Sequence, residues 1–384
     1  MNRESGRYVT TNSYQERVKA FVPEPLPPSN PTLVQESWLT HNKSAELALA
    51  RLSGMSGLVS SGEWLIYSAL RREALLTSQL EGTQATLTDV FDEEAGLSVA
   101  NADDVEEVTQ YLQAYRYVRE QINSPHGLPV SVRLLTEAHK ILLHGIRGTN
   151  KQPGHIRTSQ NWIGGSRPGN AAFVPPPPEY VVDLLADLEL FIHDERQSLP
   201  PLVKIALVHA QFETIHPFLD GNGRIGRLLI AMLLETWEVL PEPLLYVSGY
   251  LKKHQLEYYR CLSEIRSNGN WEQWIVFFLE GVEIAAEEAQ HSIIQIASLL
   301  AMDRKKLLEN KSSSLQALRL FELLPVMPKL TAERAQQELG VTFPTASLAI
   351  KVLENADILV ETTGRSRGKS YIYRRYVDLL INDL

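Results

Sequence analysis

The sequence predicts a mainly α-helical protein with a small β-hairpin flap and a C-terminal winged helix-turn-helix domain. Apolar residues recur at helical spacing through most of the first 300 of its 384 positions. One stretch, 146–178, breaks that spacing with glycines and a run of prolines, which predicts loops and a short hairpin. After residue 311, short helical segments give way to segments that alternate like strands.

The same patterns divide the chain into four parts. Residues 1–32 end in FVPEPLPPSNP, which predicts an extended Pro-rich arm because proline fixes φ and removes a backbone donor. An N-terminal helical region over 33–118, a helical core over 119–308 and the winged helix-turn-helix over 311–384 follow. We expect helices within 44–118, 105–122, 131–145, 181–193, 202–214, 225–237, 271–308, 315–324, 331–339 and 345–355, and strands over 358–362 and 371–374.

The composition excludes several classes of protein. A charged fraction of 22% is ordinary for a globular chain and excludes wholesale disorder. The single Cys261 can form neither an intrachain disulfide nor a thiolate metal site, which favours a reducing compartment. No stretch reaches the roughly 18 apolar residues of a membrane span, and the N-terminus lacks the apolar segment of a signal peptide. We therefore expect a cytoplasmic protein.

Charge is unevenly distributed along the chain. From Lys311 onward there are 10 basic and 8 acidic residues, a balance of +2, whereas the preceding residues carry 27 against 38, or −11. The net charge of −9 argues against a protein that coats nucleic acid along its whole surface.

The densest chemistry lies in the segment 216–227, HPFLDGNGRIGR. His216 has an unperturbed pKa of about 6.5 and can take a proton from an attacking hydroxyl. The glycines let backbone N–H groups approach a ligand, and a helix starting near Arg224 points its positive end there, which favours a polyphosphate. Asp220 is suited to hold Mg²⁺ through a carboxylate oxygen. Arg224 and Arg227, three residues apart, can grip phosphates from one helix face.

Two other patterns in this region are rejected. Residues 221–226 fit the dinucleotide fingerprint G-x-G-x-x-G, but that motif needs a preceding strand, and the preceding residues have helical spacing. His209 and His216 lie seven residues apart with no third soft ligand, which is poor spacing for zinc. We expect His209 to be a hydrogen-bonded histidine within a helix.

The segment 216–227 resembles the Fic family motif H-P-F-x-[D/E]-G-N-G-R-x-x-R and matches it at every specified position. The stretches FVPEPLPP, REALLTSQLEGTQATL, IRTSQNWIGG, PPPP and LEYYRCL, and the trailing winged helix, also resemble bacterial members of this family that carry an N-terminal helical region. The resemblance covers most of the chain from about Phe21 and implies a Fic-type helical core over 119–308.

The resemblance implies protein adenylyl transfer, in which AMP moves from ATP to a Tyr, Ser or Thr hydroxyl of a protein and pyrophosphate leaves. His216 would be the general base, and Asp220 would bind Mg²⁺. Asn222 and the backbone of its two neighbouring glycines would form the anion hole, while Arg224 would grip the β/γ end. Glycine at position 223, in place of lysine, favours adenylylation over the kinase-like toxin branch. The ATP-binding set implied by the resemblance is Gly221, Asn222, Gly223, Arg224, Gly226, Arg227, Tyr258 and Tyr259.

A second motif implies internal regulation. Residues 77–82, TSQLEG, resemble the family's inhibitory motif [S/T]-x-x-x-E-[G/N], with Thr77 and Glu81 one helical turn apart. By resemblance, Glu81 would pair with Arg227 and occupy the place of the ATP γ-phosphate. The alternative is an exposed helix glutamate near an arginine, which contributes little. The same carboxylate is also suited to orient a water for removal of AMP, and both roles stay open at this point.

Two further features of the resemblance concern substrates. Residues 157–174 correspond to the family's flap, an exposed hairpin that would hold a target segment by strand addition. Tyr258 and Tyr259 would flank the adenine, although paired aromatic residues on a helix are more often part of a core.

The C-terminal domain leaves two kinds of partner open. Thr345, Ser347 and Lys351 would face a major groove, and three cations on the wing would contact phosphates. These cations are Arg365, Arg367 and Lys369. Winged helices equally serve as protein-docking or dimerisation modules, so a homodimer also stays open.

Two functions of different class therefore remain. One is an autoinhibited, Mg²⁺-dependent protein adenylyltransferase whose target includes itself or another protein. The other is a DNA-binding transcriptional regulator whose Fic domain senses nucleotide. The complete catalytic set favours the first, because a sensor needs no base such as His216 beside its anion hole.

Overall fold

The computed structural model describes residues 3–13, 16–56, 62–145, 151–196, 198–365 and 367–382. Its helices are α1 (Leu39–Ser56), α2 (Glu63–Leu80), α3 (Leu87–Glu94), α4 (Ala102–Asn123), α5 (Val132–Leu142), α6 (Pro178–His193), α7 (Pro201–Ile215), α8 (Asn222–Thr236), α9 (Val247–Lys253), α10 (Gln255–Asn268), α11 (Trp271–Glu309), α12 (Leu315–Leu323), α13 (Ala332–Leu339), α14 (Phe343–Asn355) and α15 (Arg374–Asn382). Short 3₁₀ turns are η1 (Gln35–Ser37), η3 (Pro168–Asn170) and η4 (Leu324–Val326). The strands are β1 (Gly6–Ser13), β2 (Glu16–Pro23), β3 (Lys329–Thr331), β4 (Val360–Glu361) and β5 (Ser370–Ile372). Within the described ranges, no helix combines the length and apolar character that a bilayer crossing requires.

Helix α7 lies at the centre of the helical core. Every residue of its last eleven positions, 205–215, is buried, which is typical of a helix enclosed on all sides. Helices α6, α8 and α11 pack against it. This burial fixes the axis of α7, and thereby the place at which the chain leaves its C-terminal end.

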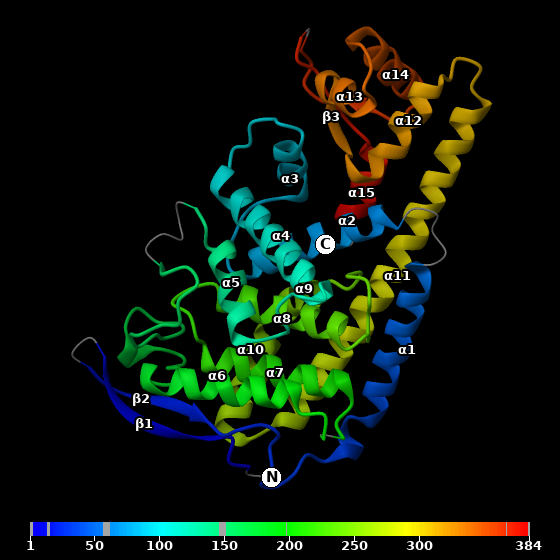
Figure 1. Cartoon of the computed structure of the whole chain (residues 1–384). Coiled ribbons are helices and arrows are strands. Elements are labelled where there is room, and N and C mark those ends of the chain that lie inside the picture. The colour runs from blue at the N-terminus through cyan, green and yellow to red at the C-terminus, as the bar shows by residue number, and fades with distance from the viewer. Residues whose placement is uncertain are drawn as a thin grey trace.

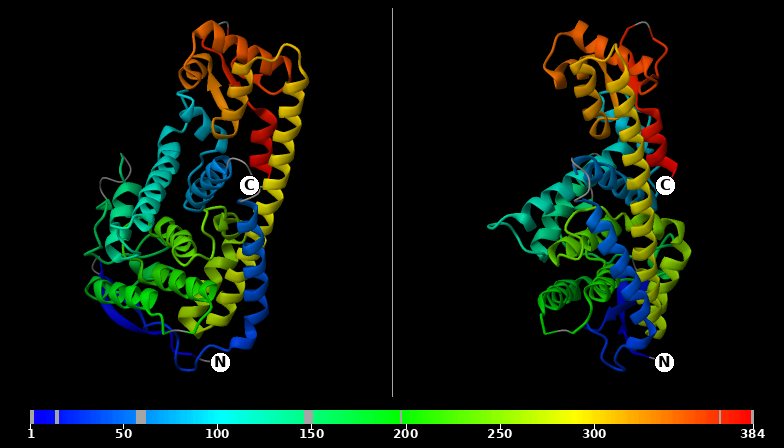
Figure 2. Two further views of the ribbon diagram at one scale, coloured as in Figure 1. Left: turned by 45° about the vertical axis from the view of Figure 1, so that its right-hand side comes forward. Right: turned by 90° about the vertical axis from the view of Figure 1, so that its right-hand side faces the viewer.

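The region 271–308, expected as one helix or two, is the single long helix α11. Figure 2 shows α1 running beside α11, in agreement with their extensive contacts. Helix α11 carries the chain from the core to the C-terminal block, and α15 returns along it (Figure 1).

The N-terminal segment differs from the extended arm that we expected over 1–32. Strands β1 and β2 form an antiparallel hairpin in which Gly6 pairs with Pro23 and Ser13 with Glu16. Residues 1, 2, 14 and 15 lie outside the described part of this segment. The β-branched and aromatic residues of YVTT and RVKAFV favour strands, and the proline-rich stretch begins only after them.

The base of this hairpin is fixed to α11. Arg3 is buried, and its guanidinium donates to both carboxylate oxygens of Glu272, at 2.6 and 2.8 Å. The indole N–H of Trp271 donates to the Ser5 hydroxyl at 3.0 Å. The first strand is therefore anchored in the core and positioned relative to it.

The C-terminal block contains α12, α13 and α14 with a three-stranded antiparallel sheet of order β3-β5-β4. Thr331 caps α13 by accepting the N–H of Arg334, and Gly340 ends that helix with a φ of +63°, both as expected. Strand β3 and helix α15 were not expected. The strand expected over 371–374 ends at residue 372, and α15 then buries Tyr376.

Candidate active site

The segment 216–227 forms a loop between two helices, α7 and α8. His216 ends α7 in the left-handed conformation, with φ of 50° and ψ of 62°, and its N–H donates to the Phe212 carbonyl at 2.9 Å. Gly221, with φ of 73°, is the last residue before α8. The loop thus places the His216 side chain and the N-terminus of α8 at one site.

Arg157, at the start of the flap, holds this loop in place. Its Nε donates to the His216 carbonyl at 2.8 Å, and its N–H donates to the Pro217 carbonyl at 2.9 Å. The side chain is 1% exposed, and burial lowers the pKa of Arg157 to about 10. The sequence did not predict that Arg157 positions this loop, because it entered that analysis only as the first residue of the flap.

His139 on α5 is a second residue that sequence reasoning missed. Its Nδ1 accepts the Gly154 N–H at 2.9 Å, so Nε2 carries the proton and donates to the Asp220 carbonyl at 3.1 Å. The ring stacks on Phe218 with 3.8 Å between centroids. Burial lowers the pKa of His139 to about 4. This neutral histidine therefore fixes the part of the loop that carries Asp220.

His216 is also neutral at pH 7. Burial lowers its pKa to about 4, and the charge of Arg157 acts in the same direction, while Glu81 opposes them. A hydrogen bond with the Glu213 backbone also opposes the shift, but burial and Arg157 outweigh it. A neutral imidazole is the form that accepts a proton from a hydroxyl.

The Asn222 side chain bridges the two ends of the loop. Its Oδ1 accepts the Phe218 N–H at 2.8 Å and its Nδ2 donates to the Phe218 carbonyl at 2.8 Å. Both polar groups of the amide therefore help to close the loop, and the assignment of Asn222 to the anion hole stays a prediction. The free backbone N–H groups at the N-terminus of α8 remain as donors for an anion.

The Glu81 carboxylate lies over this helix N-terminus. A Cβ atom on Gly223 would come within 2.2 Å of Glu81 Oε1, so only glycine leaves room for the carboxylate. Glu81 Oε1 also accepts from Arg227 Nη2 at 2.6 Å. Burial raises the pKa of Glu81, but Arg227, Arg224 and His216 outweigh it and bring that pKa below its usual value.

Arg227 is 2% exposed, and α2 supplies its hydrogen-bond acceptors. Besides Glu81, the Thr77 hydroxyl accepts from Nε at 2.6 Å and the Thr77 carbonyl from Nη2 at 3.0 Å. The two motif residues of 77–82 thus converge on one guanidinium.

Helix α2 is itself held by α9 and α10. The Glu73 carboxylate accepts from the Ser248 N–H at 3.2 Å and from the Ser248 hydroxyl. Lys252 Nζ donates to Gln79 Oε1 at 2.6 Å, and Gln255 donates to the Leu80 carbonyl at 3.4 Å. These contacts fix the end of α2 that carries Glu81.

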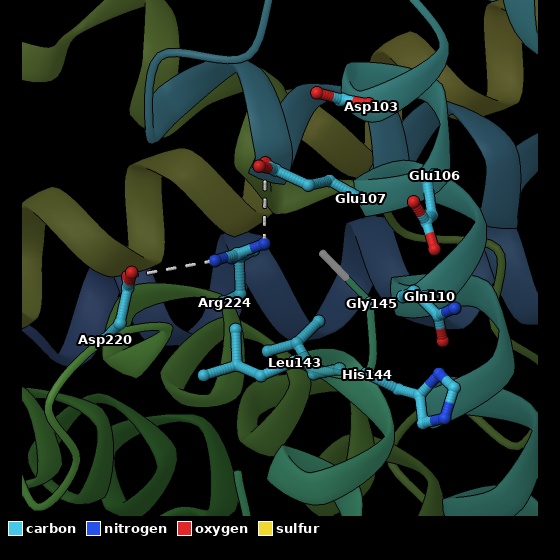
Figure 3. Close-up of a pocket in the computed structure, with 10 residues that line it drawn as sticks. Asp103, Glu106, Glu107, Gln110, Leu143, His144, Gly145, Asp220 and Arg224 are labelled. Carbon is cyan, nitrogen blue, oxygen red and sulfur yellow. Dashed lines mark ion pairs between the residues drawn. The ribbon is translucent and has the colours of Figure 1, made fainter. Parts of the chain in front are cut away.

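Asp220 and the largely buried Arg224 line a pocket beside the loop, as Figure 3 shows. Arg224 Nη1 lies 3.6 Å from Glu107 Oε2, and its Nη2 lies 3.9 Å from Asp220 Oδ1. Asp220 Oδ1 also accepts the Gly221 N–H at 2.7 Å. The Asp220 side chain is 45% exposed, so its second oxygen is available to a ligand.

Asp220 fits a Mg²⁺ ligand that acts together with nucleotide phosphates. Mg²⁺ is commonly bound by one or two carboxylates plus waters and phosphates. Over the described stretches, no group of three or more His, Cys, Asp or Glu side chains is arranged to hold a metal. The protein therefore offers one carboxylate here, and the nucleotide would have to supply further oxygens.

Gly226 and Tyr258 are both closely packed, and their assignment to the ATP-binding set stays a prediction. A Cβ atom on Gly226 would come within 2.3 Å of Glu213 Oε1, so Gly226 allows α7 and α8 to pack closely. Tyr258 is 1% exposed and its hydroxyl bonds with His209 Nε2 at 2.8 Å. The expectation that His209 is a hydrogen-bonded helix histidine is confirmed. Tyr259 is 48% exposed and stays a candidate for nucleotide contact.

Glu213, on the last turn of α7, is a buried carboxyl that the sequence did not single out. Its Oε1 has no hydrogen-bond partner among the described residues. Burial raises the pKa of Glu213 to about 7; Arg227 opposes this shift and Glu81 adds to it. Because the unfolded chain loses this proton at lower pH than the folded chain, burial of Glu213 costs stability as pH rises.

We predict that Glu213→Gln changes the pH dependence of stability, because glutamine keeps the shape of the protonated acid. The wild type loses stability between about pH 4.5 and its folded pKa of about 7. The free energy of unfolding of the variant relative to wild type should therefore rise by roughly 3 kcal/mol over that window and stay constant above it. Urea unfolding at a series of pH values measures this. A difference that does not vary with pH would contradict the prediction.

Two family models match the chain: the Fic/DOC family over residues 129–234 and the Fic/DOC family N-terminal region over residues 39–120. Protein adenylyltransferase fic-1 of Caenorhabditis briggsae is 31% identical over 122 residues, which is 32% of this chain and 22% of that relative. A probable protein adenylyltransferase of Aquifex aeolicus is 42% identical over 67 residues, or 17% of this chain and 21% of that relative. The chain thus spans about a fifth of the length of these curated relatives.

A solved structure of a Fic family protein from Desulfovibrio desulfuricans has the same fold. The TM-score is 0.59 at 21% identity, and the match covers 89% of this chain and 97% of that chain. The C. elegans Fic-1 structure, at 20% identity, matches with a TM-score of 0.52 over 67% of this chain and 74% of that one. The solved structures show that the fold is shared. The two family models and the curated relatives show that residues 39–120 and 129–234 are Fic/DOC family regions, with distant homology to protein adenylyltransferases.

Proposed function

We propose that this protein is a Mg²⁺-dependent protein adenylyltransferase that moves AMP from ATP to a Tyr, Ser or Thr hydroxyl of a protein. One observation carries the proposal. A single loop joins a neutral imidazole, an exposed carboxylate and the N-terminus of a helix, at His216, Asp220 and α8. These are a base, a metal ligand and an anion-binding end, which phosphoryl-type transfer needs together.

The reaction assigns one task to each group. The target hydroxyl gives its proton to His216 as its oxygen bonds to the α-phosphorus, and the bond from that phosphorus to the pyrophosphate oxygen breaks. The N-terminus of α8 and the Arg224 guanidinium stabilise negative charge on the phosphates. Asp220 would hold Mg²⁺, which neutralises phosphate charge when bound. His139 and Arg157 position this loop without contacting substrate.

The proposal includes inhibition by the chain itself. The Glu81 carboxylate lies over Gly223 and accepts from Arg227, so it takes the space and the donor that a phosphate would use. It also repels a phosphate as a like charge. Removal of AMP from a modified hydroxyl would use the same carboxylate to orient a water.

We further propose that the C-terminal block is a winged helix-turn-helix domain that docks on another protein. Helix α14 exposes two large apolar side chains, Phe343 at 45% and Leu348 at 60%, which suit a protein contact better than a DNA groove. The alternative, a DNA-binding regulator, rests on three exposed cations around the tip of β4 and β5. They are Arg365, Arg367 and Lys369.

We predict that removing the charge of Glu81 activates self-modification. In Glu81→Gln, label from ATP labelled on the α-phosphate should enter the protein at least about tenfold faster than in wild type, because a phosphate can then reach Arg227. Adding His216→Ala to that variant should reduce labelling to background. Gel autoradiography with and without Mg²⁺ measures both effects.

Glu94→Gln is the matched control, because Glu94 also ends a helix and pairs with an arginine, Arg71 at 2.6 Å, away from the loop. Its labelling should equal that of wild type. Labelling that persists in the double variant with His216→Ala would refute the role of His216. Equal labelling in Glu81→Gln and wild type would refute the inhibition.

The DNA-binding alternative makes a separate prediction. Under our proposal, fluorescence anisotropy should show no difference in duplex-DNA affinity between wild type and the variant Arg365→Glu with Arg367→Glu. A salt-dependent affinity that this variant loses would instead support the regulator, because phosphate contacts release counterions.

A further inference from the structure

The N-terminal hairpin and the flap form one continuous surface. The Phe21 N–H donates to the Val174 carbonyl at 3.0 Å, and Ile163 and Phe173 exchange backbone hydrogen bonds of 2.8 and 3.1 Å. Glu16 on β2 accepts from Arg167 and from the Gly169 N–H, each at 2.7 Å. Strand β2 thus extends the flap hairpin, on the side of the molecule opposite α1 (Figure 1).

Alternation along β2 gives the surface two different faces. Val18 and Ala20 are buried together with Val174 of the flap. Because successive side chains of a strand point to opposite faces, Arg17 and Lys19 lie on the other face, and both are exposed. Neither makes an ion pair with any residue that the structure describes.

The second face leads to the loop that carries His216. Phe173 follows the same alternation and points away from the Val174 face, and Arg266 of α10 stacks on its ring at 3.9 Å. The charge of Arg266 also contributes, after burial and Arg157, to the lowered pKa of His216. The cations on this side are therefore Arg266, stacked on Phe173, and Lys19 and Arg17 along β2. The four residue steps from Phe21 to Arg17 span roughly 13 Å.

The charge of this surface is opposite to that of its surroundings. Residues 6–23 and 157–174 contain five basic residues and one acidic residue, Glu16. Arg157 is buried, and the exposed cations that β2 places on the second face are Arg17 and Lys19. The acidic residue is itself bound to Arg167. The first 310 residues as a whole have a balance of −11. The positive surface attracts a negatively charged segment of a partner, whereas the acidic remainder of this protein repels other negatively charged parts of that partner.

We propose that this face of the β1–β2 hairpin and flap is the docking surface for target proteins, and that it selects a hydroxyl residue flanked by aspartates or glutamates. The inference rests on the proposed adenylyl transfer and names its substrate class. Arg266 contacts acidic residues close to the hydroxyl, and Lys19 and Arg17 contact those further along the segment. Ion pairs of this exposed kind set encounter and orientation more than tight binding.

The test uses the full chain with Glu81→Gln, Mg²⁺ and ATP labelled on the α-phosphate. The substrates are synthetic peptides with one central tyrosine, threonine or serine, flanked either by glutamates or by lysines. At least one glutamate peptide should have a kcat/KM at least about tenfold above its lysine counterpart, with a preference that shrinks at high salt. Adding Arg17→Glu with Lys19→Glu should erase the preference by raising KM for the glutamate peptide, while KM for ATP stays unchanged.

The matched control is Lys43→Glu with Arg51→Glu, which makes the same charge change on exposed positions of α1. It should keep the preference. Equal rates for both kinds of peptide would overturn the inference, and so would self-modification without labelling of any peptide. A higher KM for ATP in the Arg17 and Lys19 variant would assign these cations to the nucleotide instead. Absence of self-modification in the same reactions would refute the proposed function itself.

Discussion

The buried guanidinium of Arg227 is the group on which the rest of the site depends. A buried arginine without acceptors costs several kcal/mol, so its donors must be satisfied in every state of the protein. Here α2 satisfies them through Thr77 and Glu81, and the same contacts place a carboxylate over the N-terminus of α8. The packing of α2 therefore controls the access of a phosphate to the site. A phosphate can replace only the Glu81 carboxylate as an acceptor for Arg227, while Thr77 keeps its own hydrogen bonds.

Helix α2 also connects the site to the remainder of the molecule. Ser248 and Lys252 of α9 hold the half that carries Glu81. The turn η4 of the C-terminal block contacts α2 as well, and Lys329 of that block pairs with Asp92 of α3. The helix that ends beside Glu81 thus contacts both the helical core and the C-terminal block.

The sequence predicted those features whose cause is local. The motif 216–227, the cap at Thr331 and the left-handed Gly340 follow from neighbouring residues alone, and the structure contains each of them. His139 and Arg157 were missed because their partners, Asp220 and His216, lie about 60 to 80 positions away. The packing of Asn222, Gly226 and Tyr258 could not be predicted, because a sequence pattern gives residue identity without the direction of the side chain. The β1–β2 hairpin is local and was missed because the prolines after residue 22 were given more weight than the strand-favouring residues before them. Its pairing with the flap joins segments about 150 residues apart, which no local pattern indicates.

The most direct test of the central claim compares ATP and ADP binding to wild type and Glu81→Gln by isothermal titration calorimetry with Mg²⁺. If Glu81 takes the place of the γ-phosphate on Arg227, the substitution should strengthen ATP binding at least about tenfold, or about 1.4 kcal/mol, and leave ADP binding nearly unchanged. Equal changes for both nucleotides, or no change for ATP, would contradict the account.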